Sequence, residues 1–384
     1  MKTSTHCFNE THEQARQTAL RFVEREVLPH IDEWEEAGEF PRALYRKAAE
    51  AGLLGVGYPE TLGGTGEGDL FLKVAVSEAL MRSTSGGLVA GLGSHDIALP
   101  PIVQWGRQAM REQVVPEVLS GEAVAALAIT EPGGGSDVAN LRTRAEKQGD
   151  HYRINGSKTF ITSGHRADYF TVAVRTGEPG QNGLSMLLVE GNRPGFSRGR
   201  ALKKMGWWAS DTAELFFDDV TVPKENLIGH EHGGFMVIMT NFLQERLMLC
   251  LMGAMTARLA LEEAMAYTSE REAFGRAING FQVTRHKLVD MATQVELATQ
   301  YTYHCAGLMD AGKAPVKEVA MAKNYTAQVA ESVTREAVQL HGGMGYMREA
   351  VVERLARDAR ILAIGGGTTE IMKELIARQM GLGS

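Results

Sequence analysis

The sequence predicts an α+β protein of three parts: a helical domain over residues 1–122, a β domain over 123–233 and a helical bundle over 234–384. Three observations support this fold class. A chain of 384 residues is long enough for about two or three domains with substantial cores. Short segments rich in β-forming residues are confined to the middle of the chain. Long segments with helical spacing of their apolar residues fill the last part.

The first part contains segments whose apolar residues follow a helical period, separated by turns rich in glycine and proline. Pro29 ends the first segment and Pro41 opens the second, because proline lacks the N–H that a helix interior needs. We therefore expect helices over Thr11–Leu28, Pro41–Gly52, Leu70–Arg82 and Arg111–Leu119.

The middle part has short, often alternating segments that are typical of strands. The apolar run Ala123–Ile129 predicts a buried strand, and Asn155-Gly156 predicts a hairpin turn between two strands. A β-sandwich or barrel is the expected architecture. The other expected strands are Arg142–Ile154, Lys158–Thr162, Tyr169–Arg175, Leu184–Glu190 and Ala213–Val222.

The last part is helical again from about Gly234. Phe242–Tyr267 is apolar nearly all round, which predicts burial on several faces. Thr284–Met309 and Pro315–Leu340 are long and amphipathic, and Gly342 is a suitable residue to end the second helix. Two such antiparallel helices indicate a four-helix bundle.

Composition narrows the possible functions. The chain is 44% hydrophobic and carries a formal net charge of −7, so we expect a soluble protein without a general nucleic-acid-binding or bilayer-binding surface. Cys7, Cys250 and Cys305 form no CxxC pair, and the histidines show no metal-ligand spacing. No apolar run approaches the ~20 residues that span a bilayer, and Met1–Thr11 is no secretory signal. The expected location is cytoplasmic, with no membrane insertion.

Several enzyme classes lose support because their motifs do not occur. The chain has no GxGxxG, GxxxxGK[ST], HExxH or GxSxG, the motifs of Rossmann dehydrogenases, P-loop ATPases, zincins and α/β-hydrolases. Thr130–Asp137 (TEPGGGSD) instead follows a predicted strand with a Pro-Gly-Gly-Gly turn. Such a turn leaves backbone N–H groups free to wrap a flat polar ring or a phosphate. The alternative is a hairpin turn that only connects two strands.

Several motifs in matching order give the chain a resemblance to the acyl-CoA dehydrogenase family over essentially its whole length. Leu127–Ser136 (LAITEPGGGS) resembles the first flavin-contacting segment of that family. Phe160-Ile161-Thr162 resembles the second, whose aromatic residue lies against the isoalloxazine. The resemblance implies an FAD cofactor. The FAD contacts it implies here are Leu127, Ile129, Thr130, Gly135, Ser136, Phe160, Ile161 and Thr162.

Other matching positions imply that subunits share the cofactor. Arg271 and Phe274 of REAFG, together with Gln282, match residues that reach the FAD of a neighbouring subunit. The resemblance thus implies a homo-oligomer, expected to be a dimer of dimers. The alternative interpretations are that Phe274 is an ordinary core residue and that His341 is a turn residue. The resemblance also implies FAD contacts by Gln339, Gly342 and Gly343 of QLHGG. It implies two more by Thr368 and Glu370, in a loop that closes over the flavin.

Desaturating an acyl-CoA thioester needs a carboxylate that removes the α-proton. In many members of the family a Glu near the C-terminus does this, but Gly366 stands at the matching place. The isovaleryl and long-chain branches place the base at the position of Glu245 instead. Glu245, Leu249 and Met252 share a helical face, so the carboxyl should meet an apolar pocket that raises its pKa. The alternative is a first-turn Glu paired with Arg246.

The residue beside the vacated base bears on the substrate. Gly365 replaces a Tyr of straight-chain enzymes, which leaves space for a methyl branch at C3. The terminal Glu370–Arg378 is more like the long-chain branch. We expect a 3-methyl-branched acyl-CoA, from isovaleryl to citronellyl-like, and an electron-transferring flavoprotein as partner. The expected substrate contacts are Ser136, Arg246, Gly365, Gly366 and Arg378.

Other activities of the same family stay open at this point. A straight long-chain acyl-CoA dehydrogenase is one alternative, and an acyl-CoA oxidase, a nitroalkane oxidase or a flavin monooxygenase is another. Monooxygenase relatives generally lack the base, so Glu245 argues against them. A DNA-associated relative would need a basic surface, which the net charge of −7 disfavours.

Overall fold

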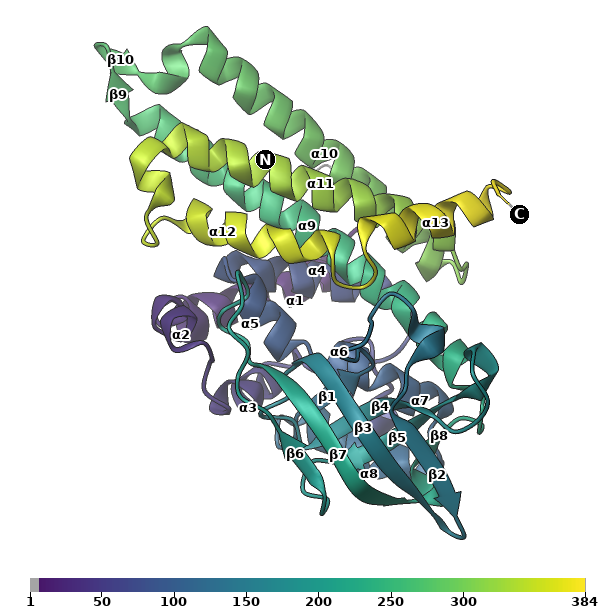
Figure 1. Ribbon diagram of the computed structural model, residues 1–384. Helices are drawn as coiled ribbons and strands as arrows, with labels where there is room; N and C mark the ends of the chain where they lie inside the picture. Colours follow the sequence, from purple (N-terminus) through teal and green to yellow (C-terminus); the bar gives the residue numbers. More distant parts are fainter. Residues whose placement is uncertain (1–6, 384) are drawn as a thin grey trace.

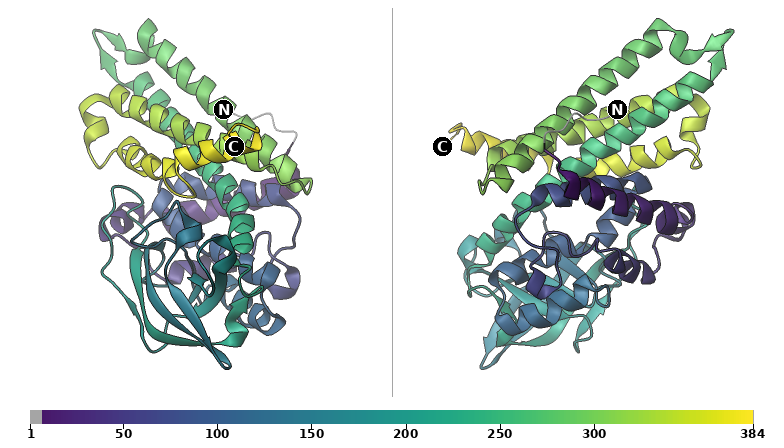
Figure 2. Two further views of the ribbon diagram at one scale, coloured as in Figure 1. Left: turned by 45° about the vertical axis from the view of Figure 1, so that its right-hand side comes forward. Right: turned by 180° about the vertical axis from the view of Figure 1, so that it is seen from behind.

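The computed structural model describes residues 7–383 and has the predicted helical, β and helical parts (Figure 1). The C-terminal helices lie at one end of the molecule and the sheet at the other, with N-terminal helices packed between them and behind the sheet (Figures 1 and 2). Residues 1–6 of the predicted first domain and Ser384 of the last lie outside the described residues. The boundaries at residues 122 and 233 stay a prediction, while the fold class is confirmed.

The four predicted N-terminal helices correspond to α1, α3, α4 and α8, each beginning or ending within a few residues of the expected bounds. Asn9 caps α1, Asp69 caps α4 and Ser85 caps α5, each by accepting a backbone N–H. The helices α2 and α5–α7, which are short or glycine-rich, were not predicted. The bounds are α1 (Glu10–Phe22), α2 (Ile31–Ala37), α3 (Ala43–Glu50), α4 (Leu70–Leu80), α5 (Gly86–Leu92), α6 (His95–Ala98), α7 (Pro100–Trp105) and α8 (Gln108–Leu119).

The β domain is one eight-stranded sheet in the order β6-β7-β3-β2-β4-β5-β8, with β1 paired in parallel to β4. Its two halves meet at a single parallel pair, Arg144 with Arg175, between β2 and β4. Strands of both halves contribute side chains to one buried core. The bounds are β1 (Ala125–Ala128), β2 (Arg144–Gln148), β3 (His151–Thr162), β4 (Tyr169–Arg175), β5 (Leu184–Glu190), β6 (Phe196–Arg198), β7 (Thr212–Pro223) and β8 (Leu227–Ile228).

The predicted hairpin at Asn155-Gly156 is wrong. β3 runs unbroken through these residues, and the turn lies earlier, at Gly149-Asp150 between β2 and β3. Gly156 has φ +145° and marks a register shift against β7. A Cβ there would lie 2.7 Å from the Cα of Thr143, so this glycine permits close backbone approach inside a bulge. The expected strand over residues 142–154 is accordingly two strands.

The C-terminal part is built on α9 (Gly234–Glu270), α10 (Gln282–Asp310), α11 (Val316–His341) and α12 (Val351–Ala359), which pack together as the predicted bundle (Figure 1). By length and composition α9 is apolar enough to cross a membrane, in contrast to the sequence expectation. Here α9 packs against α4, α10, α11 and α12, which accounts for its apolar faces. Gly342, at φ +60°, ends α11 as predicted. A short hairpin, β9 (Glu272–Ala273) and β10 (Arg276–Ala277), joins α9 to α10, and α13 (Thr369–Gln379) follows α12.

A polar junction joins the three parts. The Asp358 carboxylate at the end of α12 accepts the backbone N–H of Gly86 at 3.0 Å and of Trp207 at 2.6 Å. Gly86 and Gly87 leave the space that the Trp207 residue fills, since a Cβ on either would lie less than 3 Å from it. Burial raises the pKa of Asp358 to about 7. The loop before β7 is thereby held between α5 and α12.

Candidate active site

The glycine-rich turn after β1 is held at its base by a buried ion pair. Lys158 Nζ lies 2.9 Å from Glu131 Oε1 and donates to the carbonyl of Ile129 at 2.9 Å. The Glu131 carboxylate also accepts the backbone N–H of Arg142 at 2.6 Å and of Thr143 at 2.8 Å. Burial lowers the pKa of Lys158 to about 8, against the opposing effect of Glu131. These bonds make the base of the turn rigid.

The tip of the same turn is exposed and carries no side-chain bulk. A Cβ added to Gly133 or Gly134 would meet nothing within 4 Å, and Ser136 is exposed. The carbonyl of Thr130 accepts the N–H of Thr159 at 2.9 Å, which ties the turn to β3. The N–H of Gly134 donates to the Glu131 carbonyl at 3.0 Å within the turn, so the exposed Gly133 and the Ser136 hydroxyl are the groups placed to meet a polar ligand.

Phe160 is the most unusual residue of β3. It has φ +59°, in the left-handed region that aromatic residues rarely adopt, and its side chain is 68% exposed. It lies in the register shift between Lys158 and Ile161, so the bulge turns its ring outward while Ile161 is buried. An exposed ring on a strained backbone indicates a functional site, here one for a flat partner. Thr162, the third residue of the motif, is partly buried at the end of β3.

The two residues of the first motif that precede the turn point inward. Leu127, in β1, is partly buried and Ile129 is buried, both in the core between the sheet and the helices behind it. Gly135 lies against the Thr130 side chain, since a Cβ there would come within 3.2 Å of it. The structure thus places Thr130, Gly135, Ser136, Phe160 and Thr162 on one end of the sheet. Their flavin contacts stay a prediction.

Glu245 lies on α9, where that helix passes from the β domain into the bundle. The residue is partly buried, and its Oε2 atom is buried without a hydrogen-bond partner among the described residues. Burial raises the pKa of Glu245 to about 7, although the charges of Arg246 and Lys323 act to lower it. A carboxyl with this pKa is suited to take a proton near neutral pH.

The glycine loop before α13 faces this carboxyl. Gly366 has φ +65°, and a Cβ added to it would lie 2.5 Å from Leu249 Cδ1 and 3.6 Å from Glu245 Oε1. The loop is held by two bonds, from Arg246 Nε to the Gly366 carbonyl at 3.0 Å and from Lys323 Nζ to the Gly367 carbonyl. The Glu245 carboxyl, which belongs to α9, therefore lies beside Gly366 of the glycine loop.

Arg246 is buried, and its guanidinium lies over the Phe242 ring at 5.2 Å. Its hydrogen bond goes to the glycine loop, not to Glu245. Gly365 has room, since a Cβ there would meet the Ile361 carbonyl at 3.6 Å, an ordinary contact. The coenzyme contact expected of Arg246 and the substrate contact expected of Gly365 stay predictions.

Four residues of this site were not predicted from the sequence. Glu131 lies within the first motif and Lys158 lies two residues before the second, and neither was assigned a role from the sequence. Lys323 and Asn324 of α11 hold the glycine loop, with Asn324 Nδ2 donating to the Thr369 carbonyl at 3.2 Å. A signal for Lys323 existed, because it occupies a buried face of α11 that consists otherwise of alanine, valine and threonine until His341 at the helix end.

A second group of predicted residues lies far from Glu245. Arg271 and Phe274 stand in the β9–β10 hairpin at the tip of the bundle, and Gln282 opens α10 beside it (Figure 1). Phe274 has φ +52° and is 95% exposed, so it is not a core residue. Arg271 and Gln282 are exposed too. Glu270 is about 37 Å further along α9 than Glu245 at a rise of about 1.5 Å per residue.

The QLHGG motif lies at the end of α11, on the side of the bundle opposite α13 (Figures 1 and 2). Gln339, Gly342 and Gly343 are exposed, whereas His341 is buried, bonded to the Ala337 carbonyl and stacked on Tyr267. His341 is thus a helix-end residue, as its alternative interpretation held. Within a single chain, this motif therefore does not lie beside Glu245.

The last predicted residues belong to α13. Thr368 caps this helix by accepting the N–H of Ile371, and Glu370 is exposed in its first turn. Thr368 therefore follows directly on the glycine loop beside Glu245. Arg378 lies in the last turn, about three turns beyond Thr368, and is exposed. The structure does not place Arg378 beside the glycine loop, so its substrate contact has no support from the contacts seen here.

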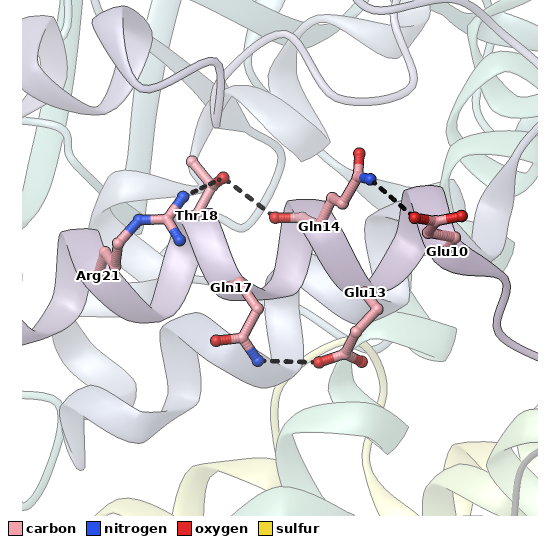
Figure 3. A pocket seen from close by; sticks show the side chains of 6 residues that line it. All are labelled: Glu10, Glu13, Gln14, Gln17, Thr18 and Arg21. Atoms are coloured by element: carbon pink, nitrogen blue, oxygen red, sulfur yellow. Dashed lines mark hydrogen bonds between the residues drawn. The ribbon is translucent and has the colours of Figure 1, made fainter.

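A surface hollow of about 260 Å³ lies along α1 and has a different character (Figure 3). Its lining comes from α1 alone, and the side chains bond to one another, with Gln17 donating to Glu13 at 2.9 Å. It contains none of the predicted site residues. The lining residues are Glu10, Glu13, Gln14, Gln17, Thr18 and Arg21.

Comparison with known families covers nearly all of the chain. The acyl-CoA dehydrogenase N-terminal domain matches residues 9–122, the acyl-CoA dehydrogenase middle domain 126–220 and the acyl-CoA dehydrogenase C-terminal domain 232–381. A solved structure of a probable acyl-CoA dehydrogenase from Mycobacterium abscessus is 50% identical, with a TM-score of 0.96 over 98% of this chain and 100% of that one.

Curated relatives extend the comparison to named activities. The mitochondrial long-chain specific acyl-CoA dehydrogenase of Sus scrofa is 39% identical over 97% of this chain and 87% of its own length. The mitochondrial isovaleryl-CoA dehydrogenase of Pongo abelii is 36% identical over 96% and 88%. Subunit CarC of the caffeyl-CoA reductase-Etf complex of Acetobacterium woodii is 36% identical over 96% and 98%.

Proposed function

Because this chain belongs to the acyl-CoA dehydrogenase family, FAD-dependent oxidoreductases that dehydrogenate acyl-CoA thioesters, we propose that it acts on 3-methyl-branched acyl chains with Glu245 as the base. The observation that carries the assignment of the base is the Glu245 carboxyl beside Gly366, with a buried, unpartnered oxygen and a pKa raised by burial to about 7. The alternatives are a straight long-chain acyl-CoA dehydrogenase and an acyl-CoA oxidase.

The residues at the end of the sheet fit FAD. The exposed ring of Phe160 offers a flat surface, and the turn at Gly133 and Gly134 has no side-chain bulk that would keep a ligand from its backbone. Thr130, Ser136 and Thr162 would add hydroxyl groups around it. When bound, FAD supplies the two-electron acceptor for the hydride that leaves the β-carbon of the acyl chain.

The protein's own part in the reaction is proton removal and positioning. Glu245, as the carboxylate, accepts the α-proton, and the low polarity around its Oε2 favours the protonated product. Arg246 and Lys323 hold the Gly366–Gly367 backbone, which keeps the surface opposite the carboxyl in place. Rigid support of this kind maintains the short distances that proton transfer needs.

The substrate proposal rests on Gly365. Without a side chain, this residue leaves open a space against Ile361, one position along the chain from Gly366, the glycine that lies beside the Glu245 carboxyl. A methyl branch on C3 would occupy that space, and a Tyr ring would fill it. Sequence similarity to both an isovaleryl-CoA and a long-chain specific acyl-CoA dehydrogenase supports a chain that is branched and extended. A fit of one methyl group is worth about 10–200-fold in specificity.

We propose two kinds of partner. The exposed residues of the β9–β10 hairpin and of the α11 end would complete the FAD site of a second copy, in a homo-oligomer expected to be a dimer of dimers. An electron-transferring flavoprotein would reoxidise the enzyme, a proposal supported by the similarity to a subunit of an Etf complex. The cytoplasmic location remains a prediction.

Anaerobic bleaching of the flavin tests the substrate proposal. The purified holoenzyme is mixed with straight and 3-methyl acyl-CoA thioesters of equal length, and the rate of flavin reduction gives kcat/KM for each. We expect 3-methyl chains to be preferred about 10-fold or more. Gly365→Tyr should lower the rate with branched chains more than with straight ones, while Gly365→Ala should leave the ratio near wild type. A wild-type preference for straight chains would support the long-chain alternative instead.

A further inference from the structure

Lys323 of α11 is a buried cation without a carboxylate in contact. The residue is 1% exposed, and its Nζ donates to the Gly367 carbonyl of the glycine loop. Within residues 7–383 this is the one hydrogen bond of an ammonium that has three donors, and Lys323 forms no salt bridge there. Burial lowers the pKa of Lys323 to about 8, so the side chain is still charged at neutral pH. A buried charge is costly unless another charge compensates it.

Lys323 occupies this place because α11 crosses α9 at close range. Gly253 of α9 lacks a side chain, and a Cβ there would lie 3.1 Å from Thr326 Cβ of α11. One turn earlier on α9, Cys250 Sγ donates to the Val319 carbonyl of α11 at 3.8 Å. Lys323 lies between Val319 and Thr326 along α11, so it packs on the stretch of α9 that follows the proposed base.

The glycine loop connects Lys323 to the Glu245 carboxyl. A Cβ on Gly366 would lie 3.6 Å from Glu245 Oε1, and the next residue, Gly367, is the one whose carbonyl Lys323 binds. Burial raises the pKa of Glu245, and the charges of Arg246 and Lys323 act against that effect. In turn, the Glu245 charge favours the charged form of Lys323. The two groups therefore affect each other although they are not in contact.

From this arrangement we propose that Lys323 is a positioning residue of proton removal, which holds the glycine loop beside Glu245 and keeps that carboxyl ionised. The proposal rests on the function proposed above and adds a residue that acts through the base. A buried carboxyl must lose its own proton before it can take one from the α-carbon. A cation held at a distance favours the ionised form and leaves the carboxylate oxygens open to the substrate.

The other groups near Lys323 do not take the place of Glu245 as its counter-charge. Arg246 is itself a cation and binds the Gly366 carbonyl at 3.0 Å. Burial raises the pKa of the Cys250 thiol, which is therefore neutral. Glu370 is exposed in the first turn of α13, where water screens its charge.

The test measures kcat/KM for flavin reduction in the holoenzyme from about pH 5.5 to about pH 9. Lys323→Gln can still donate to the Gly367 carbonyl but carries no charge, whereas Lys323→Met loses both the donor and the charge. We expect the acid limb of the profile in Lys323→Gln to move up by about 0.5–1 pH unit, since an opposite charge in direct contact moves a pKa by about 1–3. On the plateau above that limb its rate should stay near that of the wild type.

Lys323→Met should show the same displacement of the acid limb together with a plateau lowered about 10-fold or more, because the loop is no longer held. Asn324→Leu is the matched control, since Asn324 holds the same loop by an uncharged bond from Nδ2 to the Thr369 carbonyl at 3.2 Å. It should lower the plateau without displacing the limb. If the limb of Lys323→Gln coincides with that of the wild type, or if Asn324→Leu displaces it as far, Lys323 only supports the loop.

A measurement without turnover tests the same pairing. Urea unfolding of the wild type, Glu245→Gln, Lys323→Gln and the double variant forms a double-mutant cycle, with Lys323→Met in place of Lys323→Gln if the latter does not fold. The changes in the urea midpoint should be non-additive at about pH 7.5 and additive at about pH 5, where Glu245 is protonated. Additive changes at both pH values would overturn the proposal. If no acyl-CoA thioester bleaches the flavin of the wild type, the proposed function fails, and the cycle still decides whether Lys323 and Glu245 are paired.

Discussion

The two ends of the C-terminal domain differ in how completely one chain builds them. At the α13 end, Arg246 and Lys323 bond to a glycine loop of the same chain, and the Glu245 carboxyl lies beside that loop. At the hairpin end, Phe274 is 95% exposed, in a hairpin that extends away from the rest of the molecule (Figure 2). Tyr346, in the turn that follows α11, is 80% exposed. Exposed aromatic residues of this kind mark surfaces that another molecule covers.

We infer from this difference that the two ends of the domain have two kinds of function. The α13 end fits the proposed chemistry, because it holds a carboxyl whose pKa is raised by its surroundings. The hairpin end fits the proposed contacts with a second copy, because Arg271, Phe274 and Gln282 are exposed. Changes at the first end should therefore affect rate, and changes at the second should affect cofactor retention and assembly.

The largest expected effect is at the base. Glu245→Gln keeps the size of the side chain and cannot accept a proton, so flavin reduction should fall about 10²–10⁴-fold. Stopped-flow bleaching by the preferred acyl-CoA measures this, with FAD content unchanged. Glu263→Gln, the same change at an exposed position of α9, is the control and should have no effect. A near wild-type rate in Glu245→Gln would remove this residue from the mechanism.

At the hairpin end, Phe274→Ala should weaken FAD retention about 30-fold, in the range of a strong contact residue at an interface. Equilibrium dialysis measures FAD per chain, and light scattering measures the mass of the assembly. Glu272→Ala, an exposed neighbour in β9, serves as the control. If Phe274→Ala keeps full FAD and slows proton removal instead, the hairpin end does not have the role in cofactor retention that we propose.

The smallest effect concerns stability and pH. Glu245 has an ordinary pKa of 4.5 and a folded-state pKa of about 7, so folding favours its protonated form. Its contribution is therefore fully present below about pH 4.5 and is lost as the pH rises through about 7. Glu245→Gln avoids that loss and should be about 1–2 kcal/mol more stable than wild type at pH 8, since partial exposure reduces the full linkage value.

Urea unfolding of the two proteins at about pH 5 and pH 8 measures this difference. At the lower pH the two proteins should be nearly equal. A stabilisation that is the same at both pH values would show that the substitution acts through packing and not through the charge of Glu245.

The prediction of the fold from sequence succeeded for long periodic segments and failed for short ones. The long helices α9, α10 and α11 have a hydrophobic pattern that few other structures satisfy. The pair Asn155-Gly156 had the composition of a hairpin, but the close approach of Thr143 requires a glycine inside a continuous strand. Local residue preferences do not encode which distant backbone comes near.

For the site, the sequence by itself determined the residue types: the glycine turn, the aromatic of β3 and a carboxylate at residue 245 where residue 366 is glycine. Only the tertiary structure decided their partners, such as the Glu131–Lys158 pair and the Lys323 bond to the Gly367 carbonyl. It also decided that the Glu245 carboxyl lies beside Gly366 with a raised pKa. The physical reason is that burial and charge–charge contacts depend on which elements pack together, a property of the folded chain and not of its local sequence.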